Sequence, residues 1–375
     1  MPEPVPPEPV LPVRVRAAIA AAPRYVAGRR PSTGGRPVAR LASNESSQPP
    51  LASVLEALSG SGSDLHRYPD STGAPLREAI AQFTSLRPED VVAGPGSVAL
   101  CRLLLETVAG HGDEVIFAWR SFEAYPQLTG LAGATAVPVP LTGSAGHDLP
   151  AMAAAVTEAT RLVFICSPNN PTGPIVSAKD MTGFMHSVPA DLLVVFDEAY
   201  GEYVDPAAGA PDPLALLAAH PNVVVLRTFS KAYGLAGARL GYALAQPELA
   251  ALLRAAQVPF AVSGPAAAAG IAGLSAAAQG ELRERVAAVA SRRDQTREWL
   301  RSLDVDVPAA QGNFVWLPLG ERSSSIAASL EEQGVFTRPF AGEGIRITIG
   351  DENEMALLRE ALPLLLSRAV DHVGA

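Results

Sequence analysis

The segment TFSKAYGLAGARLGY, residues 228–242, begins where an apolar, β-branched run, VVVLRTF at 223–229, comes to an end. Such a run is typical of a buried strand. Lys231 follows it directly and stands close to the hydroxyl groups of Thr228 and Ser230. Burial at a strand end lowers the pKa of a lysine amine, because desolvation disfavours its charged form. The segment therefore predicts a reactive amine at the carboxyl end of a strand.

Lysine is rare in this chain, since Lys179 and Lys231 are the only lysines among 29 Lys and Arg residues. A lysine retained in such an arginine-rich sequence is a candidate for chemistry that a guanidinium cannot perform. Schiff-base formation is one example, because it needs an amine that can lose its proton. Lys179 lies in SAKD, which is typical of an exposed helix start, so Lys231 is the better candidate.

Short apolar runs alternate with helix-like stretches around this segment. The expected strands are 115–118, 161–166, 192–196, 223–229 and 241–245, and the expected helices are 96–109, 151–158, 178–187 and 213–219. This alternation indicates an α/β fold with a mainly parallel sheet covered on both faces. We therefore expect a large α/β domain over residues 45–245.

The pattern changes after residue 245. Long helical stretches are expected at 246–258, 266–277 and 281–303, followed by the strand-like segments FVWLPL, FTRPF and IRITIG and a helix at 352–368. This order predicts a smaller α+β domain over residues 246–375.

Polar segments follow the expected strands, where ligands bind in open α/β sheets. SPNNPTG comes after 161–166, DEAY comes after 192–196, and GPGS at 94–97 leads into a helix. GPGS is either a plain turn or an anion site at a helix N-terminus. SPNNPTG is often only a loop. Asp197 could cap a helix, but no set of residues in metal-ligand spacing accompanies it, so no metal is expected.

Composition excludes several classes of function. The net charge of −9 and pI near 5.3 argue against nucleic-acid binding. Two cysteines are too few for a disulfide framework and favour a reducing, cytoplasmic setting. The opening MPEPVPPEPVLP lacks the features of a signal peptide and predicts a Pro-rich flexible arm over residues 1–24. The uncharged stretch 255–280 is interrupted by proline and glycine, so no membrane span is expected.

A set of motifs together resembles one enzyme family. The motifs are LASNE (41–45), RYPD (67–70), GPGS (94–97), SPNNPTG (167–173), FDEAY (196–200), TFSKAYGLAGARLGY (228–242), NFVW (313–316) and GIRITIG (344–350). The chain is similar to fold-type I aminotransferases that depend on pyridoxal 5′-phosphate, in the histidinol-phosphate aminotransferase branch. The resemblance implies a three-layer α/β/α large domain and an α+β small domain, which residues 25–44 join.

The resemblance also implies roles for the residues of the site. Lys231 would form the Schiff base and carry the proton, Asp197 would pair with the pyridine nitrogen, and Asn170 and Tyr200 would hydrogen-bond the ring oxygen. The family's phosphate positions correspond to Gly96, Ser97, Thr228, Ser230 and Arg239, with Tyr68 reaching over from the partner subunit of a homodimer. Phe122 would stack on the ring, Arg346 would bind the substrate α-carboxylate, Arg338 a distal anionic group, and Asn44 and Tyr25 would lie on the substrate side.

Two further features favour one part of the branch. WRSFEAYP at 119–126 and GSVALC at 96–101 resemble actinobacterial aromatic amino acid (phenylalanine) aminotransferases, and the acidic pair usual in histidine-pathway enzymes is replaced by Val98 and Ala99. The resemblance thus implies transfer of an amino group from an aromatic L-amino acid to 2-oxoglutarate by a ping-pong mechanism. Histidinol-phosphate aminotransfer is the main alternative. A decarboxylase on the same scaffold and a cofactor-binding protein without turnover also remain open.

Overall fold

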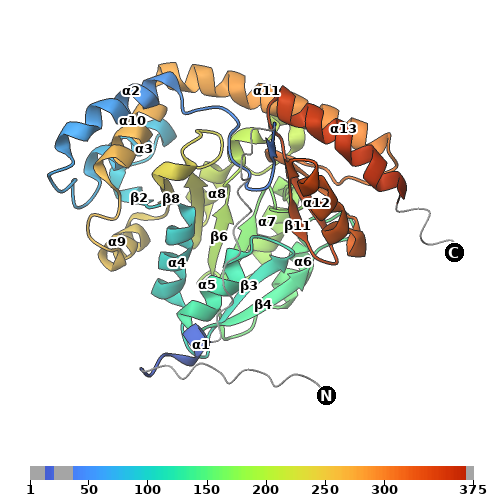
Figure 1. Ribbon diagram of the computed structural model, residues 1–375. Helices are drawn as coiled ribbons and strands as arrows, with labels where there is room; N and C mark the ends of the chain where they lie inside the picture. The colour runs from blue at the N-terminus through green and yellow to red at the C-terminus, as the bar shows by residue number, and fades with distance from the viewer. Residues whose placement is uncertain (1–12, 21–36, 369–375) are drawn as a thin grey trace.

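Within residues 13–20 and 37–368, which a computed structural model describes, seven strands form one central sheet in the order β2-β8-β7-β6-β5-β3-β4. The strands are β2 (Val91–Gly94), β3 (Glu114–Trp119), β4 (Thr135–Pro140), β5 (Thr160–Cys166), β6 (Leu193–Asp197), β7 (Val223–Thr228) and β8 (Gly241–Leu244). All pairs are parallel except the two that β8 makes with β2 and β7. The predicted mainly parallel sheet is confirmed (Figure 1).

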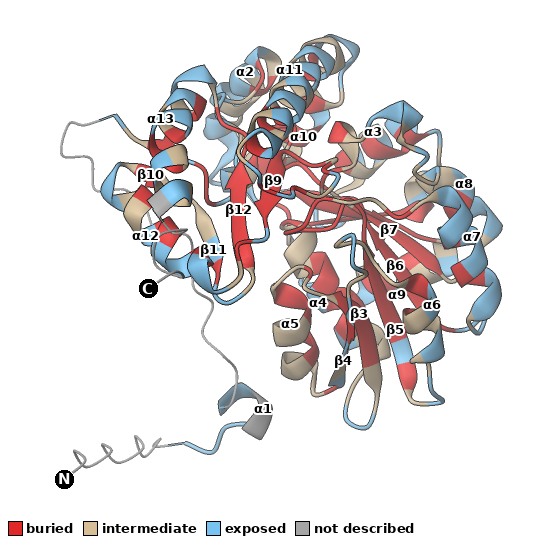
Figure 2. Ribbon diagram, turned by 90° about the vertical axis from the view of Figure 1, so that its right-hand side faces the viewer, coloured by how far each residue is buried: buried red, intermediate tan, exposed pale blue. Residues whose placement is uncertain are grey.

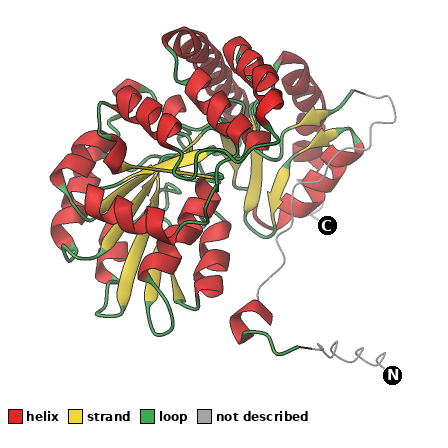
Figure 3. Ribbon diagram, turned by 90° about the vertical axis from the view of Figure 1, so that its left-hand side faces the viewer, coloured by secondary structure: helices red, strands yellow, loops and turns green. Residues whose placement is uncertain are grey.

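Helices cover both faces of this sheet because each buried strand is apolar on both sides (Figure 2). One face packs against α4 (Ser97–Val108), α5 (Ala124–Ala132) and α9 (Pro247–Ala256). The other packs against α2 (Ala52–Gly60), α3 (Ala74–Thr84), α6 (Leu149–Ala154), α7 (Ala178–Ser187), α8 (Pro213–Ala219) and α10 (Gly264–Gly273). The result is the expected three-layer α/β/α arrangement (Figure 3).

A second, smaller core forms around an antiparallel sheet with the order β11-β12-β9. Its strands are β9 (Phe314–Leu317), β11 (Arg338–Phe340) and β12 (Gly344–Thr348), and it packs with α12 (Ser323–Glu332) and α13 (Glu352–Arg368). The long helix α11 (Ala276–Arg301) joins the two cores, since Leu282 belongs to the large core and Leu300 to the small one. The division of the chain at residue 245 stays a prediction.

The N-terminal part of the described chain returns to this small core. Strand β1 (Ala39–Arg40) pairs in parallel with β10 (Val335–Phe336), and Leu41 is fully buried in the small core. A short helix, α1 (Ala17–Ala20), precedes it. Residues 42–45 leave β1 towards the carboxyl ends of the large sheet, so both ends of the sequence contribute to the same region.

Three of the expected helices, at 178–187, 213–219 and 352–368, have the same bounds as the observed α7, α8 and α13. No helix in the described part of the chain is both long and apolar enough to cross a bilayer.

Candidate functional site

Strand alternation decides which side chain at the end of β6 faces the site. Val195 packs with α4 and α5 on one face of the sheet, and Asp197 points to that same face. Glu198 points the other way, where its carboxylate pairs with Arg227 at 3.0 Å. Burial raises the pKa of Glu198 to about 7, although Arg227 opposes this shift. The adjacent carboxylates of Asp197 and Glu198 therefore lie on opposite faces of the sheet.

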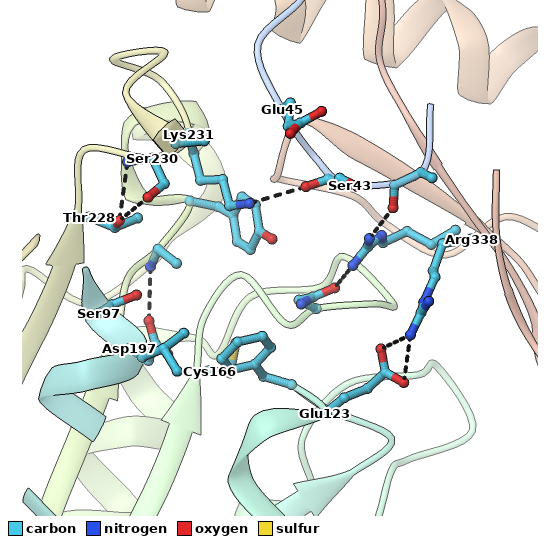
Figure 4. Close-up of a pocket in the computed structure, with 18 of the residues that line it drawn as sticks. Ser43, Glu45, Ser97, Glu123, Cys166, Asp197, Thr228, Ser230, Lys231 and Arg338 are labelled. Carbon is cyan, nitrogen blue, oxygen red and sulfur yellow. Dashed lines mark hydrogen bonds and ion pairs between the residues drawn. The ribbon is translucent and has the colours of Figure 1, made fainter. Parts of the chain in front are cut away.

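A cavity of about 330 Å³ opens beyond the carboxyl ends of β5, β6 and β7, between the two cores (Figure 4). Most of the predicted site residues line it: Ser97, Phe122, Asn170, Asp197, Tyr200, Thr228, Ser230, Lys231, Arg239, Arg338 and Arg346. Ser43, Glu45, Glu123 and Cys166 also line it, although sequence reasoning assigned them no role. The fold thus brings together segments spread over about 300 residues of sequence.

Lys231 is the amine of this cavity. Its side chain is half-buried, and Nζ donates a hydrogen bond to the carbonyl oxygen of Ser43 at 3.3 Å (Figure 4). Burial lowers the pKa of Lys231 to about 8; the charges of Arg346 and Arg239 act in the same direction and Glu45 opposes them. About a tenth of the amine is therefore neutral at pH 7, far more than for an unperturbed lysine.

Asp197 is a buried carboxylate held by two hydrogen bonds. Its Oδ2 accepts one from the Tyr125 hydroxyl at 2.7 Å, and Oδ1 accepts one from the Ala199 N–H at 3.1 Å. Burial raises the pKa of Asp197, and the Tyr125 hydrogen bond counteracts that effect. Tyr125 was missed by the sequence reasoning; it lies in the first turn of α5, three residues after Phe122, and its ring meets that of Phe122 edge to face.

The N-terminus of α4 and the end of β7 form a corner of the cavity that is rich in hydrogen-bond donors. Gly96 precedes α4 with φ of 90°, and a Cβ there would lie 2.6 Å from Nη2 of Arg239. Thr228 Oγ1 donates to Ser230 Oγ at 3.0 Å, so both hydroxyls sit at the same strand end. Backbone N–H groups, hydroxyls and a guanidinium together suit a phosphate group.

Asn44 fastens the N-terminal segment beside the cavity. It is fully buried, its Nδ2 donates to the Tyr200 hydroxyl at 2.9 Å, and its Oδ1 accepts from Thr348 Oγ1 at 3.0 Å. Asn44 does not itself line the cavity, whereas its neighbours Ser43 and Glu45 do. Burial raises the pKa of Tyr200 to about 12, so its hydroxyl keeps its proton.

Two arginines stand side by side on the small sheet. Arg338 on β11 is the register partner of Arg346 on β12, so both side chains project from the same face. Arg346 is buried and donates to Oδ1 of Asn170 and to the carbonyl oxygen of Ala42. Arg338 donates to both carboxylate oxygens of Glu123, at 3.0 and 3.2 Å. The pair gives the cavity two points at which an anion can be held.

One predicted residue, Tyr68, lies away from this cavity, and another, Tyr25, is not described. Tyr68 is 82% exposed and lines a separate apolar groove, where its ring stacks on Phe260 with centroids 4.7 Å apart. Tyr25 falls outside the described residues. Among residues 13–20 and 37–368, no group of three or more His, Cys, Asp or Glu side chains is arranged to hold a metal ion.

The fold and the residues of this cavity indicate the class of protein to which the chain belongs. The chain belongs to the aminotransferase class I and II family, whose profile matches residues 36–362. It is 47% identical over 359 residues to an aromatic amino acid aminotransferase from Nocardia farcinica, covering 95% of this chain and 99% of that relative. It is 48% identical over 349 residues to the protein of the same name from Thermobifida fusca, covering 92% and 96%.

Solved structures confirm the predicted fold. The histidinol-phosphate aminotransferase from Sinorhizobium meliloti, in complex with pyridoxal-5′-phosphate, matches with a TM-score of 0.85 at 30% identity and covers 95% of this chain and 98% of its own. The aspartate aminotransferase from Thermus thermophilus, solved with maleate, shares the fold with a TM-score of 0.75 at 24% identity, covering 87% and 90%. The predicted placement within the histidinol-phosphate aminotransferase branch is likewise confirmed.

Proposed function

We propose that this chain is a pyridoxal 5′-phosphate-dependent aminotransferase that moves the amino group of an aromatic L-amino acid to 2-oxoglutarate. One observation carries the proposal: the Lys231 amine, the buried Asp197 carboxylate and two arginines line a single cavity. The aromatic preference rests on relatives named aromatic amino acid aminotransferases that are 47–48% identical over more than nine-tenths of the chain.

The residues present fit the cofactor. Pyridoxal 5′-phosphate supplies, when bound, an electron-accepting ring for the bond changes at the substrate Cα. The N–H groups at the start of α4, the Thr228 and Ser230 hydroxyls and the Arg239 guanidinium suit its phosphate. The absence of a Cβ at Gly96 leaves the space that Arg239 occupies.

Asp197 suits the pyridine nitrogen. In the described residues no Lys, Arg or His pairs with its carboxylate, which faces the cavity from a buried position. A buried carboxylate of this kind holds a proton on a nearby ring nitrogen, because the opposite charge offsets its own desolvation. Asn170 and Tyr200, both buried and lining the same cavity, would orient the ring through its oxygen.

Lys231 would bind the cofactor and move the proton. An amine with a pKa near 8 can accept a proton from the substrate Cα and return it, because its charged and neutral forms are both populated near neutral pH. Its Nζ lies at the end of a flexible side chain. The hydrogen bond to Ser43 defines one position of that amine.

Arg346 would hold the substrate α-carboxylate. Its planar guanidinium suits a two-point contact with a carboxylate better than a lysine would. Asn170 and Ala42 fix its orientation from two sides. Holding the carboxylate fixes the position of Cα relative to Nζ of Lys231.

A homodimer with shared sites is also part of the proposal. Tyr68 and Phe260 stack in an apolar groove, and Leu65 beside them is 67% exposed. A second copy covering this groove would bury these side chains and bring Tyr68 to the partner's phosphate corner. We expect Phe260→Asp to dissociate the dimer in sedimentation experiments and to release cofactor. A fully active wild-type monomer at micromolar concentration would contradict this part of the proposal.

A cytoplasmic location is proposed on the basis of the cysteines. Cys101 and Cys166 are both buried and free. Free thiols of this kind are usual in a reducing compartment.

Histidinol-phosphate aminotransfer is the second candidate, favoured by the 30% identical structure from Sinorhizobium meliloti. Steady-state assays with phenylalanine, tyrosine and histidinol phosphate as donors and 2-oxoglutarate as acceptor separate the two. A kcat/KM that favours phenylalanine or tyrosine supports the proposal, and one that favours histidinol phosphate by orders of magnitude refutes it. Release of carbon dioxide in place of an oxo acid would identify a decarboxylase.

A further inference from the structure

Two ion pairs of opposite polarity connect the turn after β3 with the β11–β12 hairpin. Glu123, which precedes α5, accepts from Arg338 on β11 at 3.0 and 3.2 Å. Arg120, three residues earlier, donates through Nε to both carboxylate oxygens of Glu343 at 3.0 and 2.9 Å. The turn and the hairpin therefore each contribute one acidic residue and one arginine.

Only one of these pairs reaches the cavity. Glu123 and Arg338 both line it, together with Lys231, whereas Arg120 and Glu343 do not (Figure 4). Arg338 also stands beside Arg346 on the neighbouring strand. A molecule whose α-carboxylate lies on Arg346 would consequently extend its side chain towards the Glu123–Arg338 pair.

We propose that Glu123 is a specificity-determining residue that adjusts the charge of the cavity to the side chain bound in it. With a neutral aromatic side chain, Glu123 stays on Arg338 and neutralises it. With a dicarboxylic substrate, the distal carboxylate takes the place of Glu123 on Arg338. This inference rests on the proposed function, in which one cavity accepts an aromatic donor and an acidic acceptor in turn.

The exposure of the two side chains supports this exchange. The Arg338 side chain is 15% exposed and that of Glu123 is 34% exposed. The guanidinium is therefore the more enclosed partner, and the carboxylate can turn into water without moving the arginine. If a neutral aromatic side chain occupied the cavity and Arg338 had no carboxylate beside it, burial of the guanidinium would carry a desolvation cost. Glu123 offsets that cost.

The test uses two unreactive analogues, 3-phenylpropanoate for the aromatic substrate and glutarate for the acidic one. Their dissociation constants are measured by calorimetry on the loaded wild-type enzyme, on Glu123→Gln and on Glu343→Gln. The last variant is the matched control, because it removes the carboxylate of the other ion pair.

We expect Glu123→Gln to weaken binding of 3-phenylpropanoate and to strengthen binding of glutarate, changing the ratio of the two constants by about tenfold or more. Glu343→Gln should leave that ratio within about twofold of wild type. A Glu123→Gln ratio within twofold of wild type, or an equal change in Glu343→Gln, would overturn the inference. A wild-type enzyme that fails to transaminate phenylalanine would refute the proposed function, while the binding ratio still decides the role of Glu123.

Discussion

The phenolic hydroxyl of Tyr125 donates a 2.7 Å hydrogen bond to Oδ2 of Asp197, and both residues are buried. The Tyr125 ring also stacks on Phe164 at a centroid distance of 4.2 Å and meets Phe122 edge to face at 5.4 Å. One side chain therefore positions the carboxylate that would pair with the cofactor's pyridine nitrogen and supports Phe122, which would stack on the cofactor ring.

Tyr125→Phe should lower kcat by about tenfold, because a hydrogen bond to a charged group contributes about 1.5–3 kcal/mol. The hydroxyl lowers the pKa of Asp197, so its loss should raise that pKa further. The acidic limb of the kcat profile should then move to higher pH, since Asp197 acts in its ionised form. Tyr233→Phe, at a buried tyrosine on the other face of the sheet, is the control and should leave the profile unchanged. If the acidic limb of the Tyr125→Phe profile does not move, Tyr125 does not tune the pKa of Asp197 as proposed.

Lys231→Ala should abolish the visible absorbance of the bound cofactor and lower kcat by about 10³-fold, because both binding and proton transfer depend on Nζ. Absorbance spectra and donor assays measure the two effects. Lys179→Ala, at an exposed position on α7, is the matched control and should behave as wild type. Native turnover by Lys231→Ala would rule out the proposed mechanism.

The rate at which cofactor-free protein takes up pyridoxal 5′-phosphate should rise with pH through a midpoint near 8, because only the neutral Lys231 amine reacts. Arg346→Gln removes a positive charge that lowers this pKa, so the midpoint should move to higher pH. Glu45→Gln removes a negative charge that raises it, so the midpoint should move to lower pH. Stopped-flow absorbance measures each midpoint, and shifts in the same direction for both variants would contradict the assignment.

Gly96→Ala should weaken cofactor affinity by about tenfold or more, because the new Cβ would approach Nη2 of Arg239 to 2.6 Å and displace the guanidinium. Gly112→Ala is the matched control. Its φ of 91° equals that of Gly96 within a degree, but a Cβ there meets no atom within 4 Å. Both variants place a Cβ on a residue with a positive φ, so a larger loss of affinity in Gly96→Ala points to the displaced arginine. Equal affinities in equilibrium dialysis would show that the corner does not bind the phosphate.

Much of the fold could be predicted because its central strands are continuous apolar runs and its helices carry clear periodicity. Strand β4 was not predicted, since Pro138 and Pro140 interrupt it and it tolerates them only as an edge strand. The antiparallel direction of β8 was also beyond the sequence pattern, because β8 is short and its direction follows from the loop that carries Lys231.

Asp197 and Lys231 were predicted as site residues because they stand at, or just after, the carboxyl ends of apolar runs. Glu123 and Tyr125 were missed because their importance depends on partners 215 and 72 residues away. Sequence spacing does not show which residues far apart in the chain come into contact in the fold. The different settings of Asp197 and Glu198 could have been derived, since alternation along β6 assigns adjacent residues to opposite faces.

The position of Asn44 has a consequence for how the enzyme is made on the ribosome. Its backbone N–H donates to Thr348 Oγ1, a residue 304 positions later, and the same segment provides the Ser43 carbonyl that receives Nζ of Lys231. Domains fold as they emerge, so the central sheet can form while the last hundred residues are still being synthesised. Asn44 can contact Tyr200 earlier, but it gains its two hydrogen bonds with Thr348 only after that residue has left the exit tunnel. A nascent chain that stalls before that point lacks the Thr348 contacts that hold Asn44 beside the cavity.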